Sequence, residues 1–337
     1  MRINRAACGA ALTIVLFAVS PTSEAPPARS AENAYRIGFL IPVSITASAP
    51  ATPSSRRIPA FTERMKELGW IEGRTIKMEW RFSDPDEGKL RNVALELARL
   101  PVDVIVAVSS PAVQAARTAT GTIPIVAIDL ETDPVAKGFV ASLARPGKNI
   151  TGLFLDLPEL NGKRLELLRE LVPRLSRVAV LWDPSLDPAP LKAAEAAART
   201  ASVVLHVASA RRRADLDQAL RAAMQQHAGA VMVIQSPMFD VYAKDVADLA
   251  VRHRLPSIAV FKLFAELGGL MSYGPDIEAL FAQTANYVDR ILKGAQAGDL
   301  PIERPARFDM VINMKTAKAL GLTIPQSLLL RADRVIE

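Results

Sequence analysis

The strongest constraint on the fold is a regular alternation of short apolar segments with amphipathic ones, in two successive series. In the first series we expect strands at 36–41, 75–80, 104–108, 125–128 and 150–155, and helices at 58–68, 87–100, 111–118 and 135–143. In the second we expect strands at 178–182, 203–207, 230–234, 257–260 and 270–273, and helices at 160–171, 189–200, 215–226 and 240–253. A helix over 277–292 and a strand over 308–312 follow. Apolar strands separated by helices predict an α/β fold with parallel sheets covered on both faces.

The N-terminus has the pattern of a secretory leader. Arg2 and Arg5 precede an apolar stretch, and small and turn-forming residues follow it up to Ala31. The stretch is shorter than the roughly 20 residues of a transmembrane helix. Cys8 lies at the start of this stretch rather than after it, so we expect no lipid anchor and no cysteine in the mature chain. The sequence therefore predicts a soluble periplasmic protein, cleaved between Ala25 and Ala31.

Charge and motifs argue against several classes of function. The formal net charge is +6, and the cations are scattered among acids apart from the run 211–213, which we interpret as a solvated loop. His206, His227 and His253 lack metal-ligand spacing, and the chain has no phosphate-binding glycine loop, dinucleotide fingerprint or nucleophile elbow. We expect neither an enzyme nor a nucleic-acid binder, and no cofactor or metal.

Several predicted strands end in a polar residue followed by proline: Ser109-Ser110-Pro111, Asp133-Pro134, Asp183-Pro184, Ser236-Pro237 and Gly274-Pro275-Asp276. Each is a good helix start, and capping alone explains any one of them. Several of them facing one cleft would favour an anion site, because helix N-termini bind carboxylates. Ser109 and Ser110 are the best candidates, since an aspartate cap would repel an anion.

Aromatic residues make up 5% of the chain, so their positions are informative. Trp182, Phe261 and Tyr273 fall at or just beyond predicted strand ends, where a ring could stack on a flat ligand or pack in the core.

Four motifs carry a resemblance to a known family: Leu68-Gly-Trp-Ile-Glu-Gly-Arg-Thr-Ile76, Leu143-Ala-Arg-Pro-Gly-Lys-Asn-Ile-Thr-Gly152, Gly268-Gly-Leu-Met-Ser-Tyr-Gly-Pro-Asp276 and Ala319-Leu-Gly-Leu-Thr-Ile-Pro325. In these motifs the chain resembles ABC transporter substrate-binding proteins of the tryptophan and tyrosine uptake type, the TrpX-like group. The resemblance implies the type I periplasmic-binding-protein fold, two Rossmann-like lobes joined by hinge strands. It implies no catalysis, a ligand like the aromatic amino acids that characterised relatives bind, and a membrane permease with its ATPase as partners. Together with the anion site expected at the helix starts, this predicts a small carboxylate-bearing solute, such as an aromatic or other amino acid.

The resemblance also points to individual residues. The segment 109–112 stands where similar proteins often carry a Gly-Thr-Pro-Ala turn, Asp133 begins an Asp-Pro-Val motif, and Tyr273 and Asp276 belong to Tyr-Gly-Pro-Asp. The loop 44–55, which normally touches ligand, departs from the family by its many Pro, Ser and Ala residues. We expect Asp133 or Asp276 to pair with a ligand ammonium group. The full set of candidate ligand-binding residues is Ser44, Ser109, Ser110, Asp133, Trp182, Gln235, Phe261, Tyr273 and Asp276.

The same reasoning predicts a division of the chain. Residues 1–30 form the signal peptide, 35–152 with about 274–305 form lobe 1, and 153–273 with about 306–337 form lobe 2. We expect a monomer whose lobes close by hinge motion. The alternatives are an exported ligand-sensing protein that serves a separate receptor and, less in keeping with the motifs, an exported enzyme.

Overall fold

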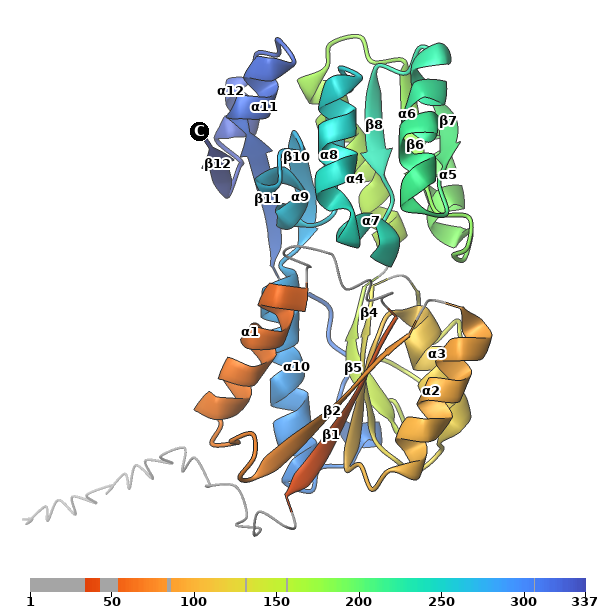
Figure 1. The fold of residues 1–337 in the computed structure, drawn as a ribbon, viewed down its shortest axis with the longest axis vertical. Coiled ribbons are helices and arrows are strands. Elements are labelled where there is room, and N and C mark those ends of the chain that lie inside the picture. Colours follow the sequence, from red (N-terminus) through yellow and green to blue (C-terminus); the bar gives the residue numbers. More distant parts are fainter. Residues whose placement is uncertain (1–33, 43–53, 84–85, 131, 156, 306) are drawn as a thin grey trace, which may run out of the picture.

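The computed structural model describes residues 34–42, 54–83, 86–130, 132–155, 157–305 and 307–337, and Figure 1 shows them as two lobes stacked along the long axis. The predicted leader and Ser44 lie outside these residues. No helix in the described part is both long and apolar enough to cross a membrane.

Lobe 1 is built on a five-stranded parallel sheet with the strand order β2-β1-β3-β4-β5. Its strands are β1 (Tyr35–Pro42), β2 (Ile76–Ser83), β3 (Val104–Val108), β4 (Ile125–Asp129) and β5 (Ile150–Phe154). Its helices are α1 (Ser54–Glu67), α2 (Glu87–Arg99), α3 (Ser110–Ala119) and α10 (Ile277–Leu292).

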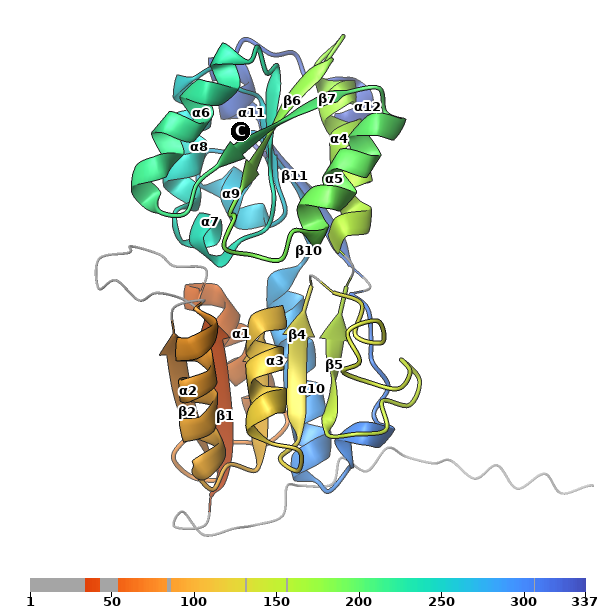
Figure 2. The same ribbon diagram turned by 90° about the vertical axis from the view of Figure 1, so that its right-hand side faces the viewer.

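The side chains of β1 alternate between two apolar clusters, one on each face of the sheet. Ile37, Phe39 and Ile41 belong to the apolar cluster shared with α1 and α10, and Leu40 belongs to the cluster shared with α2 and α3. Successive side chains of a strand point to opposite faces, and all four of these side chains are buried. Helices therefore pack on both sides of the strand, as Figure 2 shows.

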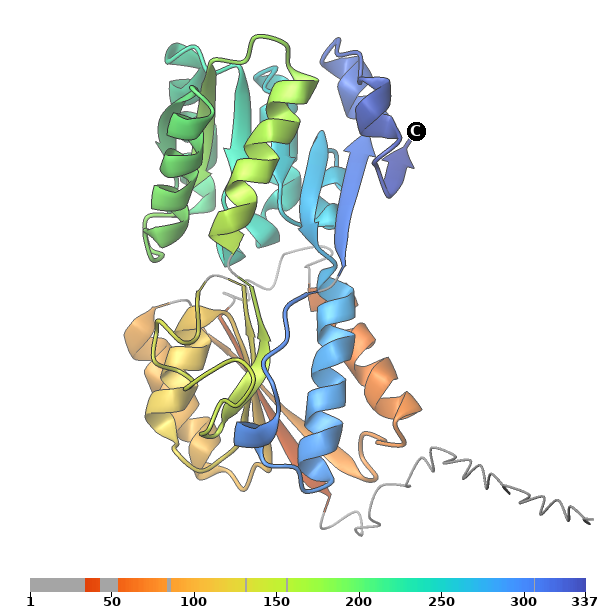
Figure 3. The same cartoon turned by 180° about the vertical axis from the view of Figure 1, so that it is seen from behind.

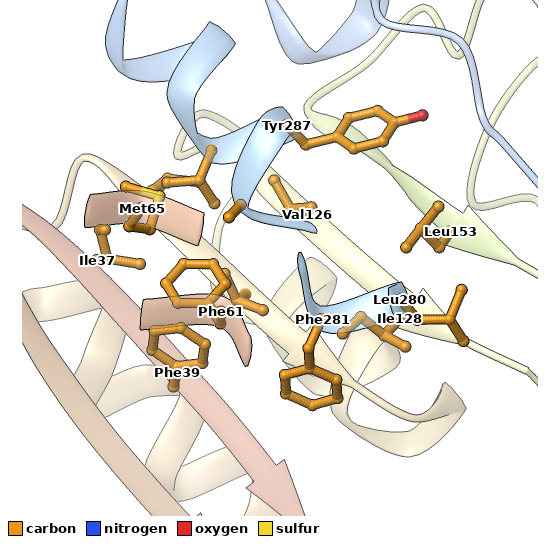
Figure 4. Packing of buried hydrophobic residues seen from close by; sticks show 14 of the residues in the cluster. Ile37, Phe39, Phe61, Met65, Val126, Ile128, Leu153, Leu280, Phe281 and Tyr287 are labelled. Carbon is orange, nitrogen blue, oxygen red and sulfur yellow. The ribbon is translucent and has the colours of Figure 1, made fainter. Parts of the chain in front are cut away.

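The helix α10 follows β10 of lobe 2 in sequence but packs on lobe 1. Its side chains Leu280, Phe281 and Tyr287 belong to the same buried apolar cluster as Phe61 of α1, and Figure 4 shows part of this cluster. The Trp70 indole, which is almost fully buried, donates a hydrogen bond of 2.8 Å to Asp289 and fixes the helix to the turn after α1.

Lobe 2 has a seven-stranded sheet with the order β12-β11-β10-β9-β8-β6-β7. Its strands are β6 (Arg177–Trp182), β7 (Val204–Ser209), β8 (Ala230–Val233), β9 (Ser257–Ala259), β10 (Met271–Pro275), β11 (Phe308–Asn313) and β12 (Arg334–Ile336). Its helices are α4 (Leu157–Leu171), α5 (Ala189–Thr200), α6 (Leu216–Gln225), α7 (Pro237–Val241), α8 (Ala243–Arg252), α9 (Lys262–Glu266), α11 (Met314–Ala319) and α12 (Gln326–Leu329).

The chain passes between the lobes after β5, between β10 and α10, and again before β11 (Figure 3). The last passage explains a departure from a purely parallel sheet. Because β11 re-enters lobe 2 from lobe 1, it runs opposite to β10, and the two pair antiparallel.

The prediction of a helix over 135–143 is wrong. The amides of Lys137 and Phe139 bond back to Asp133 and Pro134, which makes one turn, and Gly138 then adopts a left-handed φ of 67° that ends it. Phe139 is thereby buried against the core of lobe 1. The helix expected over 240–253 is divided into α7 and α8, and the short α9 was not expected.

Candidate functional site

A cavity of about 620 Å³, partly open to solvent, lies between the two lobes. Lobe 1 contributes residues at or after the ends of β1, β3 and β4 and from the starts of α1 and α10, and lobe 2 contributes residues from α7 and from the segments that follow β8 and β9. Ligands of open α/β sheets bind outside the carboxyl ends of the strands, so this is the position expected for a site. The polar lining residues are Arg57, Ser109, Gln235 and Asp240.

The rest of the described lining is apolar. It includes Ile41, Ile128, Leu130, Ile277, Val241 and Phe261. Apolar walls with a few polar groups that fix orientation are typical of small-molecule sites.

Ser109 joins β3 to α3 in an unusual backbone conformation. Its φ is 83° and its ψ is 157°, a region that residues with a side chain rarely adopt. The amide donates a bond of 2.8 Å to the carbonyl of Ile128, which fixes the turn. The hydroxyl does not cap α3, and it is buried without a hydrogen-bond partner. A free hydroxyl therefore lines the cavity at a helix N-terminus, where negative charge is favoured.

Arg57 and Asp240 form an ion pair across the cavity, from α1 of lobe 1 to α7 of lobe 2. Arg57 Nη2 lies 3.0 Å from Asp240 Oδ2, and both side chains are more than four-fifths buried. The Gln235 amide donates to the same oxygen at 3.0 Å. The guanidinium carbon lies 5.1 Å from the centre of the Phe261 ring, a cation–π distance.

Burial dominates the electrostatics of the Asp240 carboxyl. Loss of water around the side chain raises its pKa above the ordinary value, and the charge of Arg57 and the hydrogen bond from Gln235 offset this only in part. The ionised form of Asp240 therefore gains from any further positive charge or hydrogen-bond donor that enters the cavity.

Among the candidates from sequence, Ser109, Gln235 and Phe261 line the cavity. Ser110 faces a neighbouring open groove instead, because it lies one residue further along the turn, in the first turn of α3. Asp133 is exposed, and its carboxylate accepts the amides of residues 135 and 136. Neither residue belongs to the described lining of the cavity.

The remaining three candidates serve the packing and the hinge. Trp182 is buried in the apolar cluster of lobe 2 under α4 and α5. Tyr273 stacks on Phe308 at 6.2 Å between ring centres, where β10 pairs with β11. Asp276 caps α10 through the amides of residues 278 and 279 and pairs with Lys262 at 3.2 Å. The structure does not bring these three residues into the lining of the cavity.

Sequence reasoning missed Arg57 and Asp240. Arg57 stands one residue before the helix we expected at 58–68, and Asp240 was read as the first residue of a helix. The two residues are 183 positions apart in the sequence, so the sequence did not indicate that they form an ion pair. The available signal was the short Ser236-Pro237 helix start, which is one of the capped junctions and carries Asp240 in its first turn.

Comparison with known proteins shows the family of this chain. A model of the family described as "ABC transporter substrate binding protein" matches residues 42–336, which is most of the chain. The chain belongs to this family. The membership predicted from the four motifs is thus confirmed, and so is the α/β fold with parallel-sheet lobes.

Individual relatives show the same similarity. A tyrosine-binding protein of Clostridioides difficile (strain R20291) is 26% identical over 274 residues, covering 78% of this chain and 75% of that protein. The solved structure of an ABC domain in complex with L-Trp from Streptococcus pneumoniae is 25% identical, covers 90% of this chain and all of that one, and has a TM-score of 0.79. A conserved domain protein from Vibrio cholerae is 26% identical, covering 89% of this chain and 99% of that one, with a TM-score of 0.79. The family and the first of these relatives are described as binding proteins, not as enzymes.

Proposed function

We propose that this substrate-binding protein captures a small carboxylate-bearing solute, foremost an aromatic amino acid, in the cavity between its lobes. The cavity lies between the lobes and has mainly apolar walls with a few polar groups, as small-molecule sites do. The relatives described as tyrosine-binding and as a complex with L-Trp support the same class of ligand.

The observation that carries this proposal is the Ser109 hydroxyl. It is a buried donor without a partner, at the N-terminus of a helix of ten residues, and it lines the cavity. A buried polar group without a partner is costly, so its presence favours a ligand acceptor at this place. A carboxylate gains both from the hydroxyl and from the positive end of the helix dipole.

Phe261 supplies the flat apolar surface for the ligand side chain. It is the one aromatic residue of the described lining and is itself almost fully buried. Stacking of a ligand ring on it would contribute about 0.5 to 1.5 kcal/mol beyond the burial of apolar area.

We further propose that the protein acts as a periplasmic monomer, exported by means of its N-terminal leader. Ligand that touches both lobes stabilises their closed arrangement, which the permease and ATPase of the importer then recognise. The hinge segments are the passages after β5, after β10 and before β11.

Calorimetric titration with the twenty L-amino acids tests the proposal. We expect tryptophan or tyrosine to bind, and Ser109→Ala to weaken this binding by roughly 1 kcal/mol, which is about fivefold in the dissociation constant. Ser110→Ala is the matched control, because this neighbouring serine faces the outer groove. The proposed site is refuted if both serine variants bind like the parent, and the proposed ligand class is refuted if no amino acid binds.

A further inference from the structure

The charges of the cavity form a pair of opposite sign. Arg57 and Asp240 are the only charged side chains among the described residues that line it, and they come from different lobes. The lining is therefore neutral overall but carries a cation on the side of lobe 1 and an anion on the side of lobe 2. A cavity of this kind complements a zwitterion better than it complements a single ion.

Both members of the pair keep unused hydrogen-bonding capacity. The Arg57 Nε is buried and has no hydrogen-bond partner, and the Ser109 hydroxyl of the same lobe is in the same condition. On the side of lobe 2, Asp240 Oδ2 accepts from Arg57 and from Gln235, while Oδ1 accepts no hydrogen bond from any described residue. Free donors thus lie on lobe 1, and a free acceptor lies on lobe 2.

We propose that Arg57 and Asp240 recognise opposite ends of a zwitterionic α-amino acid. The ligand ammonium donates to Asp240, and the ligand carboxylate accepts from Arg57 and from Ser109. Arg57 and Asp240 pair with each other in this structure. When the ligand binds, each of them pairs with the ligand group of opposite charge instead. This inference rests on the proposed function and adds the residues that select the ligand.

The alternative acidic residues are already engaged elsewhere. Asp133 is exposed and caps its own turn, and Asp276 caps α10 and pairs with Lys262. Neither lines the described cavity. Removing one partner from a buried ion pair leaves an uncompensated charge, whereas exchange with a zwitterion leaves both residues paired.

Calorimetry with ligands that lack one charge tests the inference. The probes are L-tryptophan, indole-3-propionate, which lacks the ammonium group, and tryptamine, which lacks the carboxylate, together with the corresponding tyrosine series. We expect the parent to prefer the amino acid to either analogue by at least tenfold. In Asp240→Asn the preference over indole-3-propionate should fall below threefold, and in Arg57→Gln the preference over tryptamine should do so.

Glu266→Gln is the matched control. Glu266 lies 2.6 Å from Arg56 in another ion pair between the lobes, and it does not line the cavity. If the pairs merely hold the lobes together, this variant and Asp240→Asn change the affinity for all three probes by similar factors, and the inference is wrong. It is also wrong if Asp240→Asn keeps the parental preference. Retained binding of indole-3-propionate shows that Asp240→Asn is folded. A parent that binds neither tryptophan nor tyrosine refutes the proposed function itself, which separates the two failures.

Discussion

Replacing Ser109 by glycine should stabilise the protein and weaken ligand binding at the same time. The φ of 83° and ψ of 157° fall in a region that is essentially restricted to glycine. A residue with a side chain held there costs on the order of 1 to 3 kcal/mol. The resemblance noted in the sequence is consistent with this, since similar proteins often carry glycine at the first position of the turn.

The magnitude follows from three contributions. Glycine removes the backbone strain, about 1 to 3 kcal/mol, and also the buried hydroxyl without a partner, whose desolvation costs about 1 to 3 kcal/mol. The greater freedom of glycine in the unfolded chain opposes this by about 0.5 to 1 kcal/mol. We therefore expect Ser109→Gly to raise the free energy of unfolding by about 1 to 5 kcal/mol. Ser109→Ala removes the hydroxyl but keeps the strain, so it should lie between the parent and the glycine variant.

Urea unfolding of the ligand-free protein, followed by circular dichroism, measures these differences, and calorimetry measures the affinity of both variants for tryptophan. A glycine variant that is less stable than the parent contradicts the strain argument. Equal stability of the glycine and alanine variants would limit the cost of the backbone conformation to about 0.5 to 1 kcal/mol, the amount by which the freedom of glycine in the unfolded chain opposes it. A glycine variant that is more stable but binds tryptophan as the parent does would separate the strain from the binding site.

Two further predictions concern the packing of α10 on lobe 1 and the hinge at the end of β10. Trp70→Phe keeps the buried ring but leaves Asp289 without its 2.8 Å indole donor, so the free energy of unfolding in urea should fall by about 1 to 3 kcal/mol; an unchanged value would mean that this bond does not fix α10 to lobe 1. Gly274→Ala would place a Cβ 2.5 Å from the carbonyl oxygen of Val260 at the hinge and should cost about 1 to 3 kcal/mol, whereas Gly121→Ala, whose Cβ would meet nothing within 4 Å, should stay within about 0.5 kcal/mol of the parent. Equal losses in the two alanine variants would speak against a close approach at the hinge.

Local signals in the sequence were sufficient where capping and periodicity agreed. The helices α5 and α10 have the predicted bounds, 189–200 and 277–292. In α10 the reason is visible, because Asp276 accepts the amides of Glu278 and Ala279 and so fixes the first turn. Over 135–143 the apolar pattern was instead produced by a loop that buries Phe139, and Gly138 was the signal against a helix.

The candidate site was less predictable, because it depends on which face each side chain occupies. Ser109 and Phe261 could be placed from the strand ends alone, and both line the cavity. Trp182 also ends a strand, but its ring points to the face under α4 and α5 and is buried there. A shift of one residue along a strand exchanges the two faces, so strand ends by themselves do not distinguish a wall of the cleft from the core.

The distribution of donors and acceptors over the two lobes bears on how closure would be linked to binding. A ligand shifts an equilibrium between open and closed states only by the difference in its affinity for them. Under the proposed site, a carboxylate alone touches Ser109 and Arg57, which both belong to lobe 1 and stay together whether the lobes are open or closed. The ammonium group is what reaches Asp240 on lobe 2, and this contact exists only when the lobes are close. The group that selects an amino acid over a simple carboxylate would therefore also favour closure, in addition to the contact of the ligand ring with Phe261 of lobe 2. A carboxylate without an ammonium group would then occupy the site but stabilise the closed state less than the amino acid does.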